Sequence, residues 1–170
     1  MSYFVIIASS KISLISFTAT KDRRIIIQIT IPKTIQYINE NNICDPLYVV
    51  ILVPQVDLQE QWKREFVSFG LQPYLFGGIT ESKDWEDDYN RSIIDYYTGN
   101  GIIISICIYD TYFSKIQEKI DAVEIDKMII VDEAHELSKN QMRKLSNTYN
   151  YKLGLSATPE RHSRLETQNI

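Results

Sequence analysis

The chain has 170 residues, of which 44% are hydrophobic and 24% are charged, and its formal net charge at pH 7 is −4. This length accommodates one globular domain, and the apolar content is sufficient for a packed core, which excludes a chain that is disordered throughout. A protein that coats nucleic acid needs a basic surface to displace phosphate counterions. Because the net charge of this chain is negative, any contact with nucleic acid must be local or shared with another chain or domain.

Short runs rich in β-branched residues alternate along the chain with segments of helical period. The predicted strands are apolar at nearly every position: Arg24–Ile31, Tyr48–Val53, Gly101–Ile106, Lys127–Val131 and Tyr151–Leu155. Strands of this kind are covered on both faces of a sheet. We therefore predict an α/β fold with a doubly wound, mostly parallel sheet and helices on both faces. Such a sheet binds ligands at the carboxyl ends of its strands.

Apolar residues recur at helical spacing in two places between the predicted strands. The first set follows Asp57, a residue suited to the N-cap position. Its members are Leu58, Trp62, Phe66 and Phe69. The second set is Tyr109, Phe113, Ile116 and Ile120. Each set forms one apolar face of a helix, so Trp62 is expected to be a core residue rather than a ligand contact.

Two other segments carry local signals. Ser138 and Gln141 form a capping box that predicts a helix extending to about Leu145. The stretch Gly77–Asn90 is acidic and irregular, which predicts a surface loop, although Asp84–Tyr97 also fits a helix.

A pair of carboxylates directly follows the predicted strand Lys127–Val131, in the sequence Asp132-Glu133-Ala134-His135. At the carboxyl edge of a parallel sheet, the first carboxylate can hold Mg²⁺ through its water shell. The second can orient or deprotonate an attacking water. The alternative is an acidic first turn of a helix, stabilised by the helix dipole. A four-residue match alone does not decide between these interpretations.

Two further motifs stand at strand ends, LSATPER at Leu155–Arg161 and PQVDLQEQW at Pro54–Trp62. With VDEAH at Val131–His135, their order and spacing resemble the superfamily 2 helicases of DEAH-box type. The likeness is especially to the branch shared by type III restriction subunits and repair or transcription translocases. The resemblance covers Arg24–Arg161. A weaker likeness, to a fourth and usually Thr-Tyr motif, is found at Ile106–Tyr109.

The resemblance implies the first RecA-like motor domain, a P-loop NTPase core that uses ATP and Mg²⁺ to move on nucleic acid. By position, Asp132 would coordinate Mg²⁺ and Glu133 would activate the water. His135 would couple the nucleotide state to the residues of the SAT triplet, Ser156, Ala157 and Thr158. Without the resemblance, His135 is better explained as a surface histidine at the start of a helix, and Ser156 and Thr158 as a polar strand end that caps a turn before Pro159.

The same resemblance implies nucleic-acid contacts at the start of the first predicted helix. These would come from Pro54, Gln55 and Gln61. Gln55 departs from the family, which usually has a small hydroxyl residue there. The implied partner is DNA in preference to RNA.

The phosphate-binding loop is the main departure from the family pattern. A P-loop needs glycines that let backbone N–H groups approach the phosphates, but all six glycines lie at Gly70 or later. Lys33-Thr34 is the only Lys followed by Ser or Thr, with Pro32 where the last glycine should be. Lys33 would approach the phosphates and Thr34 would reach Mg²⁺.

Two alternatives to this loop assignment stay open. Lys21 is a second candidate, less suited because Asp22 would repel phosphate and no convincing strand precedes it. A helix that begins at Pro32 and binds nothing is the other.

These features predict an N-terminal segment (1–23), a helicase-type ATP-binding domain (24–161) and a tail (162–170). The tail leads toward a second RecA-like domain, which we expect in trans or missing, so that the chain alone is a weak or inactive ATPase. One alternative hypothesis is a catalytically inactive interaction module with a degenerate phosphate loop. Another is a truncated reading frame.

Nothing in the sequence predicts export or membrane insertion. The apolar stretch near the N-terminus is short and lacks a basic start, and no stretch is long enough to span a bilayer. Cys44 and Cys107 form no disulfide framework or zinc spacing, and Cys107 is expected to be a buried, reduced thiol. We therefore expect a cytoplasmic protein with no membrane partner.

Overall fold

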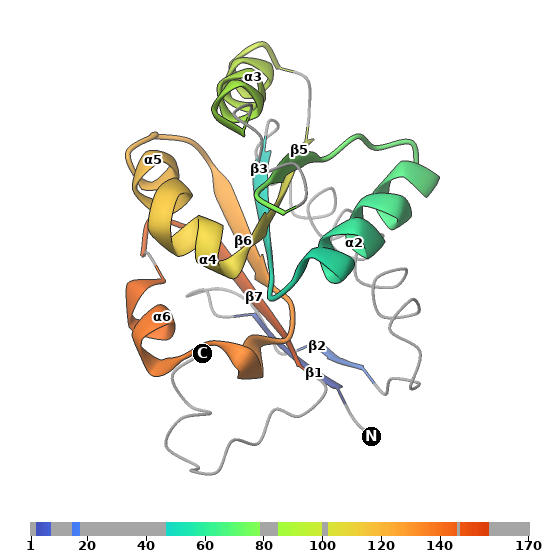
Figure 1. The fold of residues 1–170 in the computed structure, drawn as a ribbon, viewed down its shortest axis with the longest axis vertical. Coiled ribbons are helices and arrows are strands. Elements are labelled where there is room, and N and C mark those ends of the chain that lie inside the picture. The colour runs from blue at the N-terminus through green and yellow to red at the C-terminus, as the bar shows by residue number, and fades with distance from the viewer. Residues whose placement is uncertain are drawn as a thin grey trace.

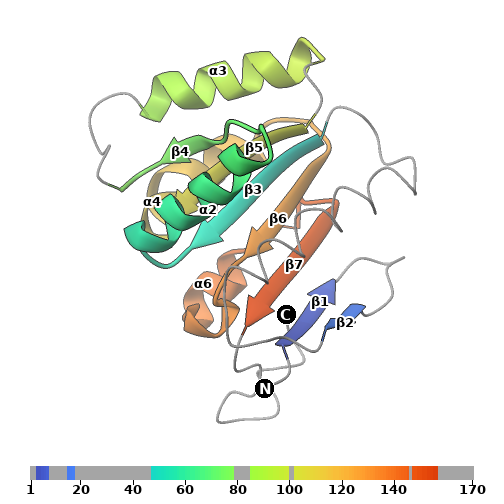
Figure 2. The same cartoon turned by 90° about the vertical axis from the view of Figure 1, so that its right-hand side faces the viewer.

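The computed structural model describes residues 47–78, 85–99, 102–145 and 147–156, and the strands β1 (Tyr3–Ile7) and β2 (Ile15–Phe17). These residues form a seven-stranded sheet of order β2-β1-β7-β6-β3-β5-β4 (Figures 1 and 2). The other strands are β3 (Leu47–Val53), β4 (Tyr74–Phe76), β5 (Ile102–Ile108), β6 (Lys127–Val131) and β7 (Tyr151–Ser156). Strands β3 to β7 are mutually parallel, whereas β1 pairs antiparallel with β7 and β2.

Helices cover both faces of the sheet (Figures 1 and 2). One face is covered by α2 (Val56–Ser68). The other face is covered by α3 (Trp85–Tyr97), α4 (Tyr109–Thr111), the π turn η1 (Tyr112–Ile116), α5 (Gln117–Asp121) and α6 (Lys139–Lys144). A short 3₁₀ turn, η2 (Ala134–Glu136), follows β6. The predicted doubly wound α/β fold is therefore confirmed.

The central strand β3 is buried at all seven positions, because it has a sheet neighbour on each side and helices on each face. Its side chains alternate between two cores. Val49 and Ile51 pack with Trp62 and Phe66 of α2, whereas Tyr48 and Val50 pack under the helices of the opposite face. This double burial explains why the parallel strands are apolar throughout rather than alternating with polar residues.

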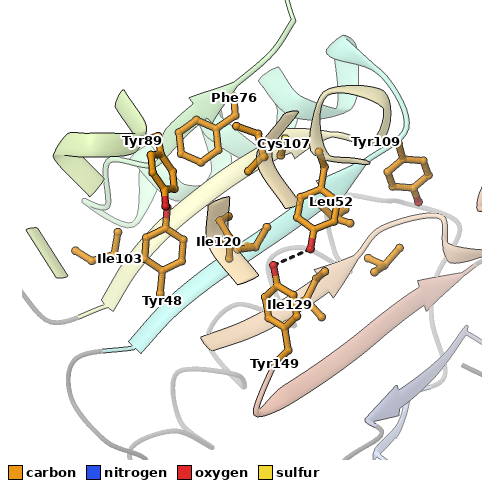
Figure 3. Close-up of a cluster of buried hydrophobic side chains, with 14 of the residues drawn as sticks. Tyr48, Leu52, Phe76, Tyr89, Ile103, Cys107, Tyr109, Ile120, Ile129 and Tyr149 are labelled. Carbon is orange, nitrogen blue, oxygen red and sulfur yellow. Dashed lines mark hydrogen bonds between the residues drawn. The ribbon is translucent and has the colours of Figure 1, made fainter. Parts of the chain in front are cut away.

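The core under α3 to α6 is rich in tyrosine, and its buried hydroxyls are hydrogen-bonded (Figure 3). The Tyr112 and Tyr149 hydroxyls lie 2.8 Å apart, and the Tyr48 hydroxyl lies 2.7 Å from Ser92 Oγ. Pairing of this kind removes the penalty of burying an unsatisfied polar group. The Cys107 thiol in the same core is free and buried, as predicted, and burial raises its pKa.

Four of the five predicted strands are confirmed as β3, β5, β6 and β7, with ends that differ by at most two residues. The fifth, Arg24–Ile31, lies outside the described residues. The capping box at Ser138 is present: the Ser138 hydroxyl accepts from the Gln141 backbone N–H, and the Gln141 side chain accepts from the Ser138 N–H.

Three local predictions need correction. The N-cap of α2 is Gln55 rather than Asp57, which lies in the first turn, where its charge favours the helix dipole. The prediction of a loop at Gly77–Asn90 is wrong from Trp85 onward, because α3 begins there. The alternative prediction, a helix at Asp84–Tyr97, is confirmed. In the second predicted helix, the fully buried residue is Tyr112, three residues after Tyr109, rather than the half-buried Phe113, four residues after it.

No helix among the residues that the structure describes has the length and apolar character needed to cross a bilayer.

Candidate functional site

The carboxyl ends of β3, β6 and β7 meet at one edge of the sheet. Leu52 pairs with Val131, and Val131 pairs with Gly154, so the residues that follow these positions come together at this edge. The Asp132 backbone N–H extends the pairing, because it donates to the Leu52 carbonyl at 2.8 Å. The sheet register therefore places Asp132 and Ser156 near each other, as the sequence predicts.

Asp132 is held by three different parts of the chain. Its Oδ1 accepts from the Glu133 backbone N–H at 2.9 Å, and its Oδ2 accepts from the indole Nε1–H of Trp62 in α2 at 2.8 Å. Its backbone carbonyl accepts a hydrogen bond from the Tyr109 hydroxyl at the start of α4. The carboxylate is half-buried and oriented by donors on both of its oxygens.

Glu133 adopts a left-handed backbone conformation, with φ of 52° and ψ of 44°, and is 6% exposed. It is the only non-glycine residue with positive φ in the described part of the chain. This conformation costs an L residue about 1–2 kcal/mol relative to ordinary backbone. It turns the chain out of β6 into η2, where the Glu136 N–H donates to the Glu133 carbonyl at 2.7 Å.

His135 joins Glu133 to Ser156. Its Nδ1 lies 3.3 Å from Glu133 Oε2 and 3.1 Å from Ser156 Oγ, and Ser156 is 9% exposed at the end of β7. An ionised carboxylate can only accept, so the contact with Glu133 favours the tautomer with a proton on Nδ1. Four of the predicted site residues thus form one connected cluster, which we call the carboxylate cluster: Asp132, Glu133, His135 and Ser156.

The other predicted nucleotide-side residues lie outside the described residues. These are Lys33, Thr34, Ala157 and Thr158. The roles assigned to them remain predictions.

The donor chemistry of the carboxylate cluster fits Mg²⁺ that arrives with a nucleotide. In the described part of the chain, no three His, Cys, Asp or Glu side chains are arranged to hold a metal ion by themselves. Nucleotide-bound Mg²⁺ does not need such a cage, because one or two carboxylates, phosphates and waters hold it. Asp132 would be the residue that contacts the ion or its water shell.

The residues predicted to contact nucleic acid lie at the start of α2. Pro54 is half-buried and Gln55 is exposed at the N-cap, immediately beyond the carboxyl end of β3. Gln61 is half-buried and lies six residues after Gln55, within α2. The contact itself remains a prediction.

Sequence reasoning missed Gln59, which lies two positions before Gln61. It is 1% exposed, and its Nε2 donates to the Phe76 carbonyl of β4 at 3.2 Å and the Ile106 carbonyl of β5 at 2.9 Å. Gly78 fits against it, because a Cβ there would lie 2.5 Å from Gln59 Oε1. The available signal was position: Gln59 falls between Leu58 and Trp62 on the buried side of the helix.

Sequence reasoning also missed the role of the Trp62 indole. The prediction that Trp62 belongs to the core is confirmed, since it is fully buried. Its N–H nevertheless reaches Asp132, 70 residues away in sequence. No spacing pattern could have indicated this contact.

A cavity of about 700 Å³ lies elsewhere, where α3 faces β4 and the beginning of β5. Its lining includes Tyr74, Trp85, Arg91 and Asp95 and shares no residue with the carboxylate cluster. Burial and the hydrogen bond to Asp95 raise the pKa of Tyr74 to about 12. We do not place the nucleotide in this cavity.

Comparisons with known proteins identify one family. Residues 28–161 match the family model described as type III restriction enzyme, res subunit (ResIII), a helicase superfamily 2 type domain with a RecA-like core. Helicase-like domains of this family typically use ATP and Mg²⁺. No curated protein and no solved structure matches the chain. Because the family model spans most of the chain and contains the whole carboxylate cluster, the protein belongs to the ResIII family.

Proposed function

We propose that this protein is the first motor domain of a nucleic-acid-dependent ATPase of the DEAH-box helicase type. It would bind ATP with Mg²⁺ and couple hydrolysis to movement on DNA, in preference to RNA, together with a second RecA-like domain. The observation that carries the proposal is the carboxylate cluster, in which residues of two motifs meet at the carboxyl edge of the sheet. Family membership supports the same interpretation.

The two carboxylates of the cluster, Asp132 and Glu133, would have different roles. Asp132 is oriented by two donors and would hold the Mg²⁺ that neutralises charge on the phosphates. Glu133 would accept a hydrogen bond from the attacking water and orient it. In the present arrangement its Oε2 contacts His135 Nδ1 at 3.3 Å, so this contact must open or be shared when the water binds.

His135 would couple changes at the Glu133 carboxylate to the end of β7. Its Nδ1 contacts both Glu133 and Ser156, so a change at Glu133 alters a hydrogen bond to the end of the neighbouring strand. Ala157 and Thr158, which follow Ser156, would continue the connection toward the second domain.

Lys33 and Thr34 would contact the phosphates and Mg²⁺ in place of a complete P-loop. Because no glycine precedes Gly70, fewer backbone N–H groups would approach the phosphates, and the proposal therefore includes weak nucleotide binding. Pro54, Gln55 and Gln61 would contact the nucleic-acid backbone. This binding should weaken steeply with salt, and insensitivity to salt would exclude phosphate contacts.

The test is thermal unfolding with and without Mg²⁺-ATP. A ligand that binds only the folded state stabilises it by about 2.7 kcal/mol at roughly 100 times its Kd, so the melting temperature should rise. Lys33→Ala should abolish the rise, whereas the matched Lys21→Ala should not. Glu133→Gln should keep the rise but lose hydrolysis. Absence of any rise for the wild type at millimolar nucleotide would exclude the ATPase proposal for this chain.

A non-catalytic interaction module is the second candidate, and the glycine-free phosphate loop is the observation that favours it. On this hypothesis the protein would bind a partner without nucleotide. Wild type and Glu133→Gln would then capture that partner equally well, and Mg²⁺-ATP would change neither the melting temperature nor the capture.

A further inference from the structure

We propose that Trp62 is a positioning residue of the carboxylate cluster, whose indole N–H fixes the orientation of the Asp132 carboxylate for Mg²⁺-nucleotide. This inference rests on the proposed ATPase function and adds a residue that none of the motifs assigns to the metal. The geometry points to it through a single contact, the 2.8 Å hydrogen bond from Trp62 Nε1 to Asp132 Oδ2.

The Trp62 ring is itself rigidly held. It is fully buried, and it stacks on Phe66 with ring centroids 5.8 Å apart and planes inclined by 28°. It packs in the core between α2 and the sheet, in the hydrophobic cluster that also contains Ile51 and Val53 of β3. Because the ring cannot turn without disturbing this packing, its N–H is a donor fixed in direction.

The Asp132 carboxylate is therefore fixed at both oxygens. Oδ1 accepts from the Glu133 N–H in the turn, and Oδ2 accepts from Trp62 on the opposite side. Rotation of the carboxylate about its terminal bond would break both hydrogen bonds. A hydrogen bond to an ionised acceptor is also stronger than one between neutral groups, so the indole holds the carboxylate firmly in this orientation.

Partners of this kind tune a metal-binding carboxylate without touching the metal. Loss of such a partner typically weakens metal affinity by about 10–100-fold. Trp62 also belongs to α2, which begins directly after the proposed nucleic-acid contacts at Pro54 and Gln55. The N–H thus joins the helix proposed to contact nucleic acid to the residue proposed to hold Mg²⁺.

The hydrogen bond can be tested without nucleotide, because the chain contains only two tryptophans. A ¹⁵N-labelled full chain should show two indole N–H signals in its NMR spectrum, and Trp85→Phe assigns them. The Trp62 signal should exchange slowly with solvent and should shift in Asp132→Asn, while the Trp85 signal stays in place. A Trp62 signal that is unchanged in Asp132→Asn would overturn the inference.

The consequence for the site is tested with Trp62→Phe, which keeps an aromatic ring and removes the N–H. The measured quantity is the Mg²⁺ concentration that gives half of the ATP-induced rise in melting temperature. It should increase at least about tenfold in Trp62→Phe. The matched control is Tyr112→Phe, which also removes one buried donor but lies on the opposite face of the sheet, and its Mg²⁺ requirement should equal that of the wild type.

The outcomes separate the two proposals. If the wild type shows no response to Mg²⁺-ATP, the proposed function fails. If the wild type responds and Trp62→Phe needs the same Mg²⁺ concentration, the role of Trp62 fails while the ATPase stands. Should Trp62→Phe not fold, the wild-type indole signal decides, because Mg²⁺-ATP should shift the signal of Trp62 and not that of Trp85. A Trp62 signal that does not respond then refutes the positioning role.

Discussion

Gln59 and Gln61 provide a matched pair for testing how the carboxyl edge of the sheet is held together. Gln59 is 1% exposed, and its amide donates to the carbonyls of Phe76 and Ile106, at the carboxyl ends of β4 and β5. Gln61 lies on the same helix and is half-buried. Replacing Gln59 with Leu keeps a similar volume but leaves both carbonyls without this donor.

The expected loss of stability follows from those two hydrogen bonds. A buried polar group left without its partner costs about 1–3 kcal/mol, and the apolar surface gained by Leu offsets part of the cost of two such groups. We therefore expect Gln59→Leu to lower the free energy of unfolding by about 2–4 kcal/mol. For a chain of this size that corresponds to a fall of roughly 5–15 °C in melting temperature.

The assay is urea unfolding followed by circular dichroism, with Gln61→Leu as the control. The control should lie within about 0.5 kcal/mol of the wild type, because the half-buried Gln61 side chain still reaches solvent. Equal stabilities for Gln59→Leu and Gln61→Leu would show that the amide does not hold β4 and β5 to α2, and the reasoning would be refuted.

Three further substitutions or conditions have expected outcomes. Glu133→Gly should be about 1 kcal/mol more stable than Glu133→Ala in urea unfolding, because both remove the carboxylate but only glycine adopts positive φ without strain; equal stabilities would contradict this. Lys127 is buried and donates from Nζ to two carbonyls near the end of α5 at 2.7 and 2.9 Å, so Lys127→Met should lose about 1–3 kcal/mol by the same measurement. Burial raises the pKa values of Tyr48, Tyr112 and Tyr149, so above about pH 10 the unfolded state releases these protons first and stability should fall. Denaturation curves at about pH 8 and about pH 11 that coincide would contradict this last expectation.

The parallel strands could be predicted from the sequence because each one is buried on both faces and so consists of a continuous apolar run. β4 could not, since only Tyr74, Leu75 and Phe76 form it and its pairing partner is β5, about 30 residues later. Three residues carry no usable periodicity. Their strand conformation is decided by the neighbouring strand rather than by local preference.

The helices show a similar division between local and non-local causes. The capping box at Ser138 is a local signal, and it is present in the structure. The choice of Tyr112 over Phe113 as the fully buried residue has no local signal, because positions three and four residues after Tyr109 both lie on the same face of a helix. Periodicity therefore cannot decide between the two aromatic residues, and packing against the core decides.

The carboxylate cluster was predictable in its membership because the carboxyl ends of parallel strands share one edge. Asp132 follows β6 and Ser156 ends β7, and these strands are neighbours. The contact between Trp62 and Asp132 was not predictable. It depends on how α2 packs against the sheet, and this tertiary arrangement cannot be inferred from the spacing of residues in the sequence.

The backbone of Glu133 bears on the choice between the two candidate functions. A left-handed residue at the end of β6 costs about 1–2 kcal/mol that glycine would avoid, and the carboxylate is buried as well. A module that uses only the fold could avoid this strain with glycine, although it would give up the contact between the Glu133 carboxylate and His135 Nδ1. A carboxylate that acts on a water molecule would explain why a buried, strained glutamate occupies this position. The strain therefore favours the ATPase proposal over the non-catalytic module, independently of the phosphate loop.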